Sequence, residues 1–334
     1  MAKRTTICAG IDTGKWKLDV ALDGSSEQLQ VENTPEGHKV LLAWLRQHRV
    51  KRIGIEASGG YEQPVVAELR RKRFVVVVFQ PAQVRAYAKF HLQRAKNDKI
   101  DAALIATCTA AVKTIHAPPD ARLLPFAEHL TMIDQIGEDI ARLKNRLETC
   151  RNPQFRQTWK EDIARLEKRE KIELKALVAA IRKHGDLATR LDLIYSVDGI
   201  GLPTAVAILV RMPEIGRITR EQAAALAGLA PYDDDSGTQV GVRHIAGGRK
   251  RLRLALYTAA LPASFRWNPQ LIALYQRLMA AGKEHKRALI ACARKLLIFA
   301  NTVVARGKPW DRKPPPARLH DRGPTSGLTP LSVS

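Results

Sequence analysis

Four carboxylates of this chain stand at positions where they could share a metal ion. Asp12 follows the apolar stretch 8–11 and Glu56 follows 53–55, so each lies at the end of an expected strand. Asp98 and Asp101 are three residues apart and share one face of an expected helix. At an effective dielectric constant near 20, each like-charge contact at about 4 Å costs roughly 4 kcal/mol, so such a cluster needs a cation. All-oxygen ligands favour Mg²⁺, with Mn²⁺ as the alternative, and two such ions about 3.5–4 Å apart would clamp a phosphodiester.

Each of these acids also has an ordinary explanation when it is taken alone. Asp12 would simply end a strand, Glu56 would lie on the surface, and Asp98 would cap the helix that carries Asp101. Their combination in one strongly basic chain favours metal binding.

A second candidate for chemistry is Ser236, which lies in the stretch APYDDDSGTQVG at residues 230–241. A serine hydroxyl is a weak nucleophile without a base or a metal nearby. Serine beside acids is commonly a turn residue, so the local spacing alone favours a turn. The polar neighbours of this serine are Asp233, Asp234, Asp235, Arg243 and His244.

The first 115 residues predict a mixed sheet flanked by helices, because three β-rich runs are followed by alternating helices and strands. Thr34 is the expected cap of the first helix, whose apolar face would comprise Val40, Leu41, Trp44 and Leu45. The run at 74–80 is fully apolar, which predicts a strand buried on both sides. The expected strands are 5–14, 16–24, 27–34, 52–59 and 74–80, and the expected helices are 34–48, 61–73 and 98–112.

Residues 119–189 predict two long amphipathic helices. The first carries apolar residues at the 3-4-3-4-3 spacing that is typical of a coiled-coil seam. Pro153 interrupts this pattern, and the segment 159–185 resumes it as a second charged helix. The pattern fits equally a hairpin within one chain and pairing between two chains. The seam residues are Ile133, Ile136, Ile140, Leu143, Leu147 and Cys150.

Residues 190–310 predict a mainly helical domain with one irregular insertion at 232–250. The stretch 195–210 resembles a helix-hairpin-helix, in which the turn Gly199-Ile200-Gly201 would let backbone N–H groups approach a phosphate. A dinucleotide fold is disfavoured, because no strand precedes this turn and the third glycine of that motif is missing. The tail after Trp310 is rich in Pro, Gly and Ser, a composition typical of disorder.

The charge of the chain points to a polyanionic partner. Its 55 Lys and Arg outnumber 33 Asp and Glu, for a net charge of +22, and the isoelectric point is near 10.2. Between residues 236 and 322 there are 18 basic residues and three acids. Nucleic acid is the first candidate for such a partner. The basic residues expected to contact it are Arg243, Arg249, Lys250, Arg251, Arg253, Lys283, Lys286, Arg287, Arg294 and Lys295.

Cysteine usage and hydropathy indicate a cytoplasmic protein. The four cysteines are far apart and form no C-x-x-C pair, so neither a zinc site nor a disulfide framework is expected. The N-terminus lacks the apolar core of a signal peptide, and the apolar runs are too short to span a bilayer.

Several stretches in order along the chain resemble the DEDD transposases of the insertion-sequence-110 family. They include AGIDTGKWKLDVAL, IGIEASGGYEQPV, KNDKIDA, VDGIGLPTAVAIL, LAGLAPYDDDSG, IAGGRKRLRLALY and GKEHKRALIACARKLL. The similarity runs from about residue 7 to residue 310, and the GGR and RKLL features are closest to the insertion-sequence-1111 type. The order of the acids, an Asp strand, a Glu strand and an Asp-x-x-Asp helix, is that of RNase H-like nuclease domains.

This resemblance implies an RNase H-like (RuvC-like) α/β domain at 1–118, whose acids are Asp12, Glu56, Asp98 and Asp101. It further implies a helical coiled-coil linker at 119–189, a mainly α transposase domain at 190–310 with Ser236 as nucleophile, and a basic tail at 311–334. The family is guided by a bridge RNA that the element encodes and acts on donor and target DNA. A homodimer is expected, with a tetramer at synapsis, in the cytoplasm and on the nucleoid during action.

The resemblance raises Ser236 from a turn residue to the expected nucleophile, which would attack a backbone phosphate with Mg²⁺ as Lewis acid. Arg243 or Arg249 would stabilise the transition-state oxygens. Two alternatives remain from the residues. One is a metal-dependent, junction-resolvase-like nuclease that uses water in place of the serine, and the other is a non-catalytic nucleic-acid-binding protein.

Overall fold

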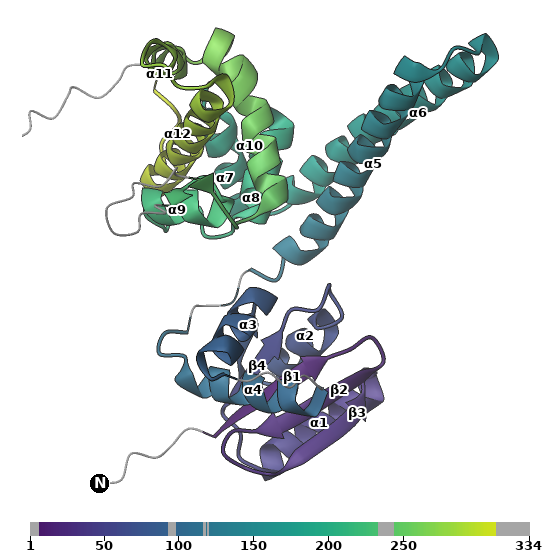
Figure 1. Cartoon of the computed structure of the whole chain (residues 1–334), viewed down its shortest axis with the longest axis vertical. Coiled ribbons are helices and arrows are strands. Elements are labelled where there is room, and N and C mark those ends of the chain that lie inside the picture. The colour runs from purple at the N-terminus through teal and green to yellow at the C-terminus, as the bar shows by residue number, and fades with distance from the viewer. Residues whose placement is uncertain (1–6, 93–97, 116–117, 119, 233–243, 312–334) are drawn as a thin grey trace, which may run out of the picture. The chain divides into compact units, whose positions relative to one another are not determined.

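The computed structural model describes residues 7–92, 98–115, 118, 120–232 and 244–311. The chain divides into two compact units, Met1–Ala117 and Pro118–Ser334, and each is described by itself (Figure 1).

The first unit is built on one five-stranded mixed sheet with the order β3-β2-β1-β4-β5. Strands β1 (Cys8–Thr13), β2 (Lys17–Leu22) and β3 (Gln28–Glu32) are antiparallel, whereas β4 (Arg52–Glu56) and β5 (Val75–Phe79) continue the sheet parallel to β1. The mixed sheet predicted from the sequence is therefore confirmed. Its order and the helices that follow are compatible with an RNase H-like domain.

The two faces of this sheet are packed in different ways. One face presents Ile11, Ile53 and Ile55 to α1 (Pro35–Gln47) and α2 (Gln63–Arg71), which bury a core of aliphatic side chains there. The other face is thinned by glycine, because Gly10 lies against the backbone of α4 (Asp98–Ala111). A Cβ at Gly10 would meet Ala102 O and Ala106 N at 2.2 Å, so α4 packs directly on the strand. The remaining helix, α3 (Pro81–Phe90), packs against α4.

Two details of the predicted packing are wrong. The strand β5 is an edge strand and not a central one, so Val75 is 43% exposed and only Phe79 is buried. On α1, Val40 is exposed, and Leu42 takes the place expected for it beside Leu41 and Leu45. The cap of this helix is as expected, since the Thr34 side chain accepts a hydrogen bond from the Gly37 N–H.

The second unit is a helical body from which a long hairpin extends (Figure 1). The two expected long helices form this hairpin and pack along each other within one chain. One large core cluster fills the body and includes residues from both helices at the base of the hairpin. The helices of this unit are α5 (Leu123–Thr149), α6 (Pro153–Arg182), α7 (Gly185–Tyr195), α8 (Leu202–Arg211), α9 (Arg220–Ala227), α10 (Lys250–Pro262), α11 (Pro269–Ala280) and α12 (His285–Arg306), with a π-helix at Ala263–Trp267.

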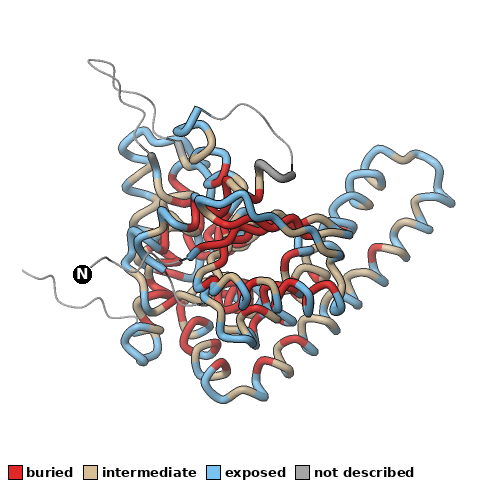
Figure 2. Tube along the Cα trace, turned by 90° about the horizontal axis from the view of Figure 1, so that it is seen from below, coloured by how far each residue is buried: buried red, intermediate tan, exposed pale blue. Residues whose placement is uncertain are grey.

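The outer part of the hairpin has its own small core of Ile136, Ile140 and Ile163, against which Leu143, Leu147 and Leu166 are partly buried, and the rest is a mixture of half-buried and exposed residues (Figure 2). Ile133 belongs instead to the core of the body. A coiled coil between two chains therefore stays a prediction.

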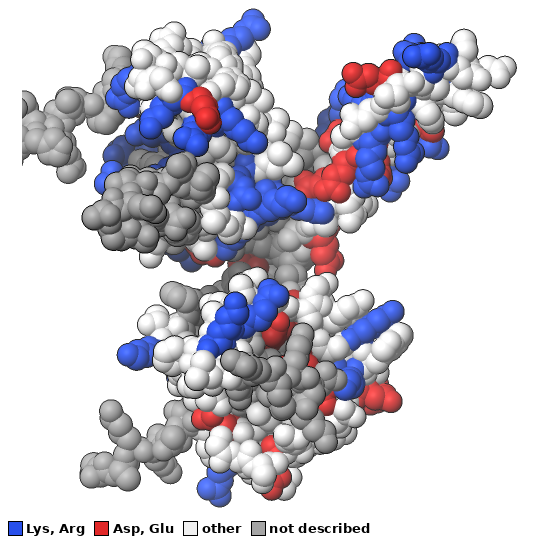
Figure 3. Space-filling model, in the orientation of Figure 1, with Lys and Arg blue, Asp and Glu red and all other residues white. Residues whose placement is uncertain are grey.

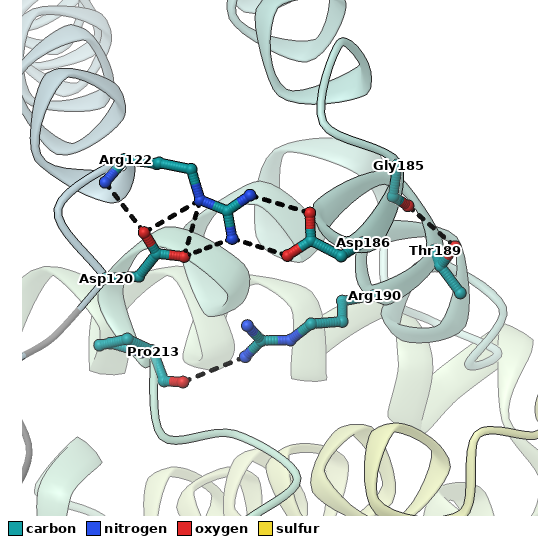
Figure 4. A network of polar contacts seen from close by, with 7 residues as sticks. All are labelled: Asp120, Arg122, Gly185, Asp186, Thr189, Arg190 and Pro213. Atoms are coloured by element: carbon teal, nitrogen blue, oxygen red, sulfur yellow. Dashed lines mark hydrogen bonds and ion pairs between the residues drawn. The ribbon is translucent and has the colours of Figure 1, made fainter.

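An ion-pair network ties the start of the hairpin to α7 (Figure 4). The Arg122 guanidinium binds Asp120 and, through two hydrogen bonds of 3.0 and 2.7 Å, Asp186. These hydrogen bonds raise the pKa of Arg122 and lower the pKa of both carboxyl groups. Beside this network, Arg190 donates to the Pro213 carbonyl at 3.1 Å.

The helices α7 and α8 flank the turn at residues 199–201, as the expected helix-hairpin-helix requires, and the motif itself stays a prediction. Gly199 has a φ of 93°, and a Cβ there would meet the Ala263 side chain at 2.4 Å. The backbone conformation and the close packing against Ala263 are therefore enough to explain why residue 199 is a glycine. Phosphate binding at this turn stays a prediction.

In the described part of the chain, α12 is the one helix long and apolar enough to cross a membrane by length and composition. Most of its apolar residues, among them Leu289, Leu296 and Leu297, are buried in the core of the body, which accounts for its composition.

Candidate functional site

Two of the four expected acids lie on the glycine-thinned face of the sheet. Side chains alternate along a strand, so Asp12 shares the face of Gly10, and Glu56 shares the face of Gly54. Gly10 pairs with Gly54 and Ile11 with Ile55 in the parallel register, so Asp12 and Glu56 occupy the next step at the carboxyl ends of neighbouring strands. The structure thus brings these two residues to one edge of the sheet.

Helix α4 brings the third acid to the same edge. Its residue Ala102 packs over Gly10 near its start, while Thr109, near its end, lies against Gly54. The Arg52 side chain donates to the Thr109 and Val112 carbonyls, so the C-terminal end of α4 lies at the amino end of β4. The N-terminal end, with the half-buried Asp101, therefore lies toward the carboxyl ends that carry Asp12 and Glu56. Asp98 is the first residue of α4, and its side chain lies outside the described residues.

The donor type of these acids fits a hard divalent cation, because every available ligand is a carboxylate oxygen. Their placement on one face and at one sheet edge fits as well. Among the side chains that the structure describes, no group of three or more His, Cys, Asp or Glu is close enough to hold a metal ion. Metal binding by Asp12, Glu56, Asp98 and Asp101 therefore stays a prediction.

A further carboxylate on this face of the sheet, Asp19, was not expected. It pairs with Asp12 across the β1–β2 hairpin and is 5% exposed. Its oxygens accept a hydrogen bond from Gln30 Nε2 at 2.6 Å and pair with Lys17 Nζ at 3.0 Å. The two residues are opposite each other because the hairpin turn is centred between Lys15 and Trp16, and the periodicity of a single strand does not reveal that pairing.

The loop after Glu56 is held by a buried carboxylate. Glu62 is 4% exposed and accepts hydrogen bonds from the backbone N–H groups of Ser58 and Gly60, at 3.0 and 2.9 Å. The Glu62 carboxyl group accepts the hydrogen bonds that these two N–H groups would otherwise make to water. The loop beside Glu56 is thereby fixed in one conformation.

Asn33 links this loop to the turn after β1. Its Nδ2 donates to the carbonyls of Gly14 and Tyr61, so its Oδ1 must accept from His38 Nε2, at 2.9 Å. His38 is 6% exposed, and burial lowers its pKa, which favours the neutral ring, with the proton on Nε2 if it donates to Asn33. Both loops next to the acids are therefore set by side chains of the scaffold.

Ser236 lies outside the described residues, as do Arg243 and the acids at 233–235. The ends of its segment are described, and they pair as the short antiparallel strands β6 (Pro231–Tyr232) and β7 (His244–Ile245). The irregular insertion expected at 232–250 is thus bordered by a short two-stranded ribbon. The base is fixed by a close contact of two glycines, because a Cβ on Gly248 would meet Gly228 N at 2.2 Å.

Three arginines expected to bind nucleic acid have partners inside the second unit. Arg249 binds Glu214 through two hydrogen bonds of 2.8 and 2.6 Å. Arg251 pairs with Asp134 and Glu138 on α5, and Arg253 donates to the carbonyls of Gly228 and Gly247. These guanidinium groups hold the body together, and a phosphate contact from them stays a prediction.

The other expected contacts are more accessible. Lys250, Lys283, Lys286 and Lys295 are exposed, Arg287 pairs with Glu284 at 3.2 Å, and Arg294 is half-buried. Lys and Arg side chains gather over the helical body in Figure 3, whereas they alternate with Asp and Glu on the α5–α6 hairpin. This surface can attract a polyanion.

An aromatic cluster beside these lysines was missed from the sequence. Phe265 is 54% exposed and meets Tyr275 edge to face at 4.8 Å, and the Tyr275 hydroxyl bonds His285 Nδ1 at 2.7 Å. Aromatic faces next to basic side chains are surfaces on which unpaired bases stack. The three residues come together because the π-helix at 263–267 turns Phe265 outward, which no short sequence pattern announces.

The carboxylates at the carboxyl ends of β1 and β4 in one unit, and the basic helical body of the other, are compatible with a protein that acts on nucleic-acid phosphates. Comparison with known proteins identifies the class as transposases. A transposase profile for the DEDD proteins of the IS110 group matches residues 9–150, and the profile of the transposase IS116/IS110/IS902 family matches residues 191–276.

The chain belongs to the IS110 family of transposases. It is 25% identical over 321 residues to the pilin gene-inverting proteins of Moraxella bovis and Moraxella lacunata, covering 91% of this chain and 97% of each relative. It is also 30% identical over 125 residues to an uncharacterized 43.6 kDa protein of insertion element IS110 from Streptomyces coelicolor, covering 37% of this chain and 31% of that protein. The protein is accordingly a DNA recombination enzyme.

Proposed function

We propose that this transposase cuts and rejoins donor and target DNA through a covalent bond between Ser236 and a DNA phosphate. Asp12, Glu56, Asp98 and Asp101 would hold Mg²⁺, and a bridge RNA encoded by the element would guide the choice of DNA. The name of the Moraxella relatives, which refers to gene inversion, supports a reaction that rejoins DNA. Residues 1–118 would form the metal-binding domain, 119–189 the helical linker, 190–310 the transposase domain and 311–334 a basic tail.

The observation that carries the metal part is the placement of Asp12 and Glu56 side by side on the α4 face, with Asp101 at the start of that helix. Bound Mg²⁺ would supply Lewis-acid polarisation of the phosphate and neutralise its charge. Asn33 and Glu62 fix the two loops that border these acids, so the carboxylates do not have to be ordered when DNA arrives.

The covalent step balances without any other reactant. The Ser236 Oγ attacks phosphorus, the bond from phosphorus to one strand oxygen breaks, and the hydroxyl proton ends on that leaving oxygen. The released hydroxyl, or one on another DNA, then attacks the phosphoserine and returns the proton to Oγ. Because phosphodiester bonds are exchanged one for one, no energy source is needed.

This chemistry requires Ser236 and the four acids to act on one phosphate, from the same chain or from two copies. A dimer, and a tetramer at synapsis, would place several such sites on the strands that must be exchanged. The acids at 233–235 would orient or deprotonate Ser236, or would repel DNA until metal and guide RNA are bound.

A trapping experiment tests the proposal. The protein, its element-derived RNA, Mg²⁺ and labelled donor and target DNA are incubated, denatured and separated on a gel. We expect a DNA band shifted by covalently bound protein, which disappears in Ser236→Ala and in Asp12→Ala. Thr238→Ala removes a hydroxyl two residues away and is the matched control, in which the adduct should persist.

Free cleaved ends that form without an adduct, and equally in Ser236→Ala, would replace the proposal with a nuclease that uses water. DNA binding without any cleavage, unchanged by Asp12→Ala, would instead indicate a non-catalytic nucleic-acid-binding protein.

A further inference from the structure

The first unit contains a basic cavity at the end of the sheet away from the acids. Its volume is about 330 Å³, and it lies where α1 ends before β4 and where α2 ends before β5. The floor is apolar and is formed by Val50 and Phe74. Every other lining residue is a cation, and these are Arg46, Arg49, Lys51, Lys72 and Arg73.

Two turns of the same kind build this cavity. After α1 the Val50 N–H bonds the Leu45 carbonyl, and after α2 the Phe74 N–H bonds the Leu69 carbonyl, both at 3.0–3.1 Å. In each turn the residue before the apolar one has a positive φ, 54° at Arg49 and 66° at Arg73. Glycine is the preferred residue at this position, because side chains with a Cβ are strained there.

The arginines at these positions therefore need a reason other than the backbone. Attraction to the negative end of a helix is one candidate, but Arg46, Arg70 and Arg71 already supply cations in the last turns. No ion pair joins Arg46, Arg49, Lys51 or Arg73 to an acid among the described residues, and all five cavity cations are exposed. The charge of this cavity is thus available to an outside anion.

We propose that this basic cavity binds the sugar–phosphate backbone of a nucleic acid. Five exposed cations around an apolar floor suit a chain of phosphates better than one phosphate, since they lie on two separate turns. The cavity lies at the amino ends of β4 and β5, whereas the acids lie at the carboxyl ends of β1 and β4. The phosphates that the cavity binds are therefore not the phosphate that would react at the acids. The proposal does not depend on the serine chemistry.

The strained turns make a test possible in which binding and folding separate. In Arg49→Gly/Arg73→Gly, glycine relieves the positive φ, so the melting temperature should stay the same or rise. Affinity for fluorescently labelled RNA and DNA strands, measured by anisotropy without Mg²⁺, should fall roughly tenfold at about 0.1 M salt. For each phosphate that the variant no longer neutralises, the slope of log affinity against log salt should become shallower by about 0.9 on duplex DNA and about 0.7 on single strands.

Lys39→Gln/Lys113→Gln is the matched control, because it removes two exposed charges of the same unit outside the cavity. It should change affinity by less than about twofold. Equal weakening in the control and the glycine variant would show that only net charge matters and would overturn the proposal. Arg49→Asn/Arg73→Asn also tolerates the positive φ and gives a second reading if the glycine variant unfolds.

Parallel titrations with single-stranded RNA, single-stranded DNA, duplex DNA and inorganic polyphosphate identify the source of the phosphates. Loss of binding to at least one nucleic acid supports the proposal, and loss for polyphosphate alone overturns it. If the parent protein forms no adduct in the trapping experiment but the glycine variant still loses affinity here, the serine mechanism is disproved and the proposal for the cavity is still supported.

Discussion

The arginines of α10 and the cations of the basic cavity carry the same charge but are used differently. Arg249 and Arg251 meet Glu214 and Asp134, which come from distant parts of the second unit. Arg49 and Arg73 have no such partner among the described residues and sit in a backbone conformation that favours glycine. A run of basic residues therefore does not by itself indicate a nucleic-acid contact. The partners and the backbone conformation of each basic residue are better indicators.

The difference has a physical origin. A guanidinium that binds a carboxylate in a partly buried site offsets its own desolvation and fixes two elements to each other. A phosphate at Arg249 would compete with Glu214 for the guanidinium group, whereas the exposed cations of the cavity give up only water and counterions.

The largest effect is expected where one carboxylate serves two arginines. Asp134 binds Arg211, whose side chain is 12% exposed, and Arg251 at 3.3 Å. Asp134→Ala leaves both cations without this partner and should lower the free energy of unfolding by about 2–3 kcal/mol. Thermal or urea unfolding measures the loss.

Asp139→Ala is the control for this prediction, because Asp139 lies on the same helix and pairs with the exposed Arg142 at 3.4 Å. That variant should lose less than about 0.5 kcal/mol. Similar losses in both variants would mean that the pairs of α10 are no more structural than a surface pair.

The pH dependence of the Glu214–Arg249 pair gives an intermediate effect. Burial is the largest single influence and raises the pKa of Glu214, but the hydrogen bonds from Arg249, a backbone hydrogen bond and the charge of Arg249 together outweigh it, so the pKa lies below its ordinary value of 4.5. The pair therefore contributes its full stability above pH 4.5, and this contribution is lost as the pH falls through the lowered pKa of the folded state. Because both side chains are about one-third exposed, Glu214→Gln should cost only about 1 kcal/mol near neutral pH.

Unfolding of the parent and of Glu214→Gln, measured from neutral pH down to about pH 3, should show their difference vanishing in acid. Glu148→Gln, at an exposed position on the hairpin, should match the parent throughout. A difference that persists unchanged in acid would show that Glu214 acts by packing and not by charge.

The comparison also shows which features a sequence can reveal. Asp12 and Glu56 were predicted at strand ends because each follows a short apolar run that can be read directly from the neighbouring residues. The structure has both residues at the ends of their strands. Asp19 was missed because its position depends on the register of a hairpin, which no single strand records. The burial of β5 was predicted wrongly because an apolar run does not say whether its strand lies at the edge of a sheet.

The ion pairs of the α10 arginines were missed for a related reason. Glu214 lies 35 residues before Arg249, and Asp134 lies 117 residues before Arg251, so neither acid stands near its partner in the sequence. Charge pairing across a fold is a property of tertiary structure. The left-handed arginines were equally hidden, because their turns have no glycine to mark them.

The smallest effect comes from exchanging arginine for lysine in the two regions, and it tests what each region recognises. Lysine keeps the charge but loses the planar two-pronged donor. Arg249→Lys should lower the free energy of unfolding by about 0.5 kcal/mol, because two hydrogen bonds to Glu214 become one, and should leave nucleic-acid affinity within about twofold.

In the cavity, Arg73→Lys should change neither stability nor affinity measurably, since lysine meets the same backbone strain and a phosphate backbone accepts a point charge. The measurements are thermal unfolding and anisotropy on the same preparations. If Arg73→Lys weakens binding as much as Arg73→Gly does, the cavity reads the geometry of the guanidinium and not only its charge. The two regions would then use arginine for the same two-pronged bond, one toward a carboxylate of the protein and the other toward a phosphate from outside.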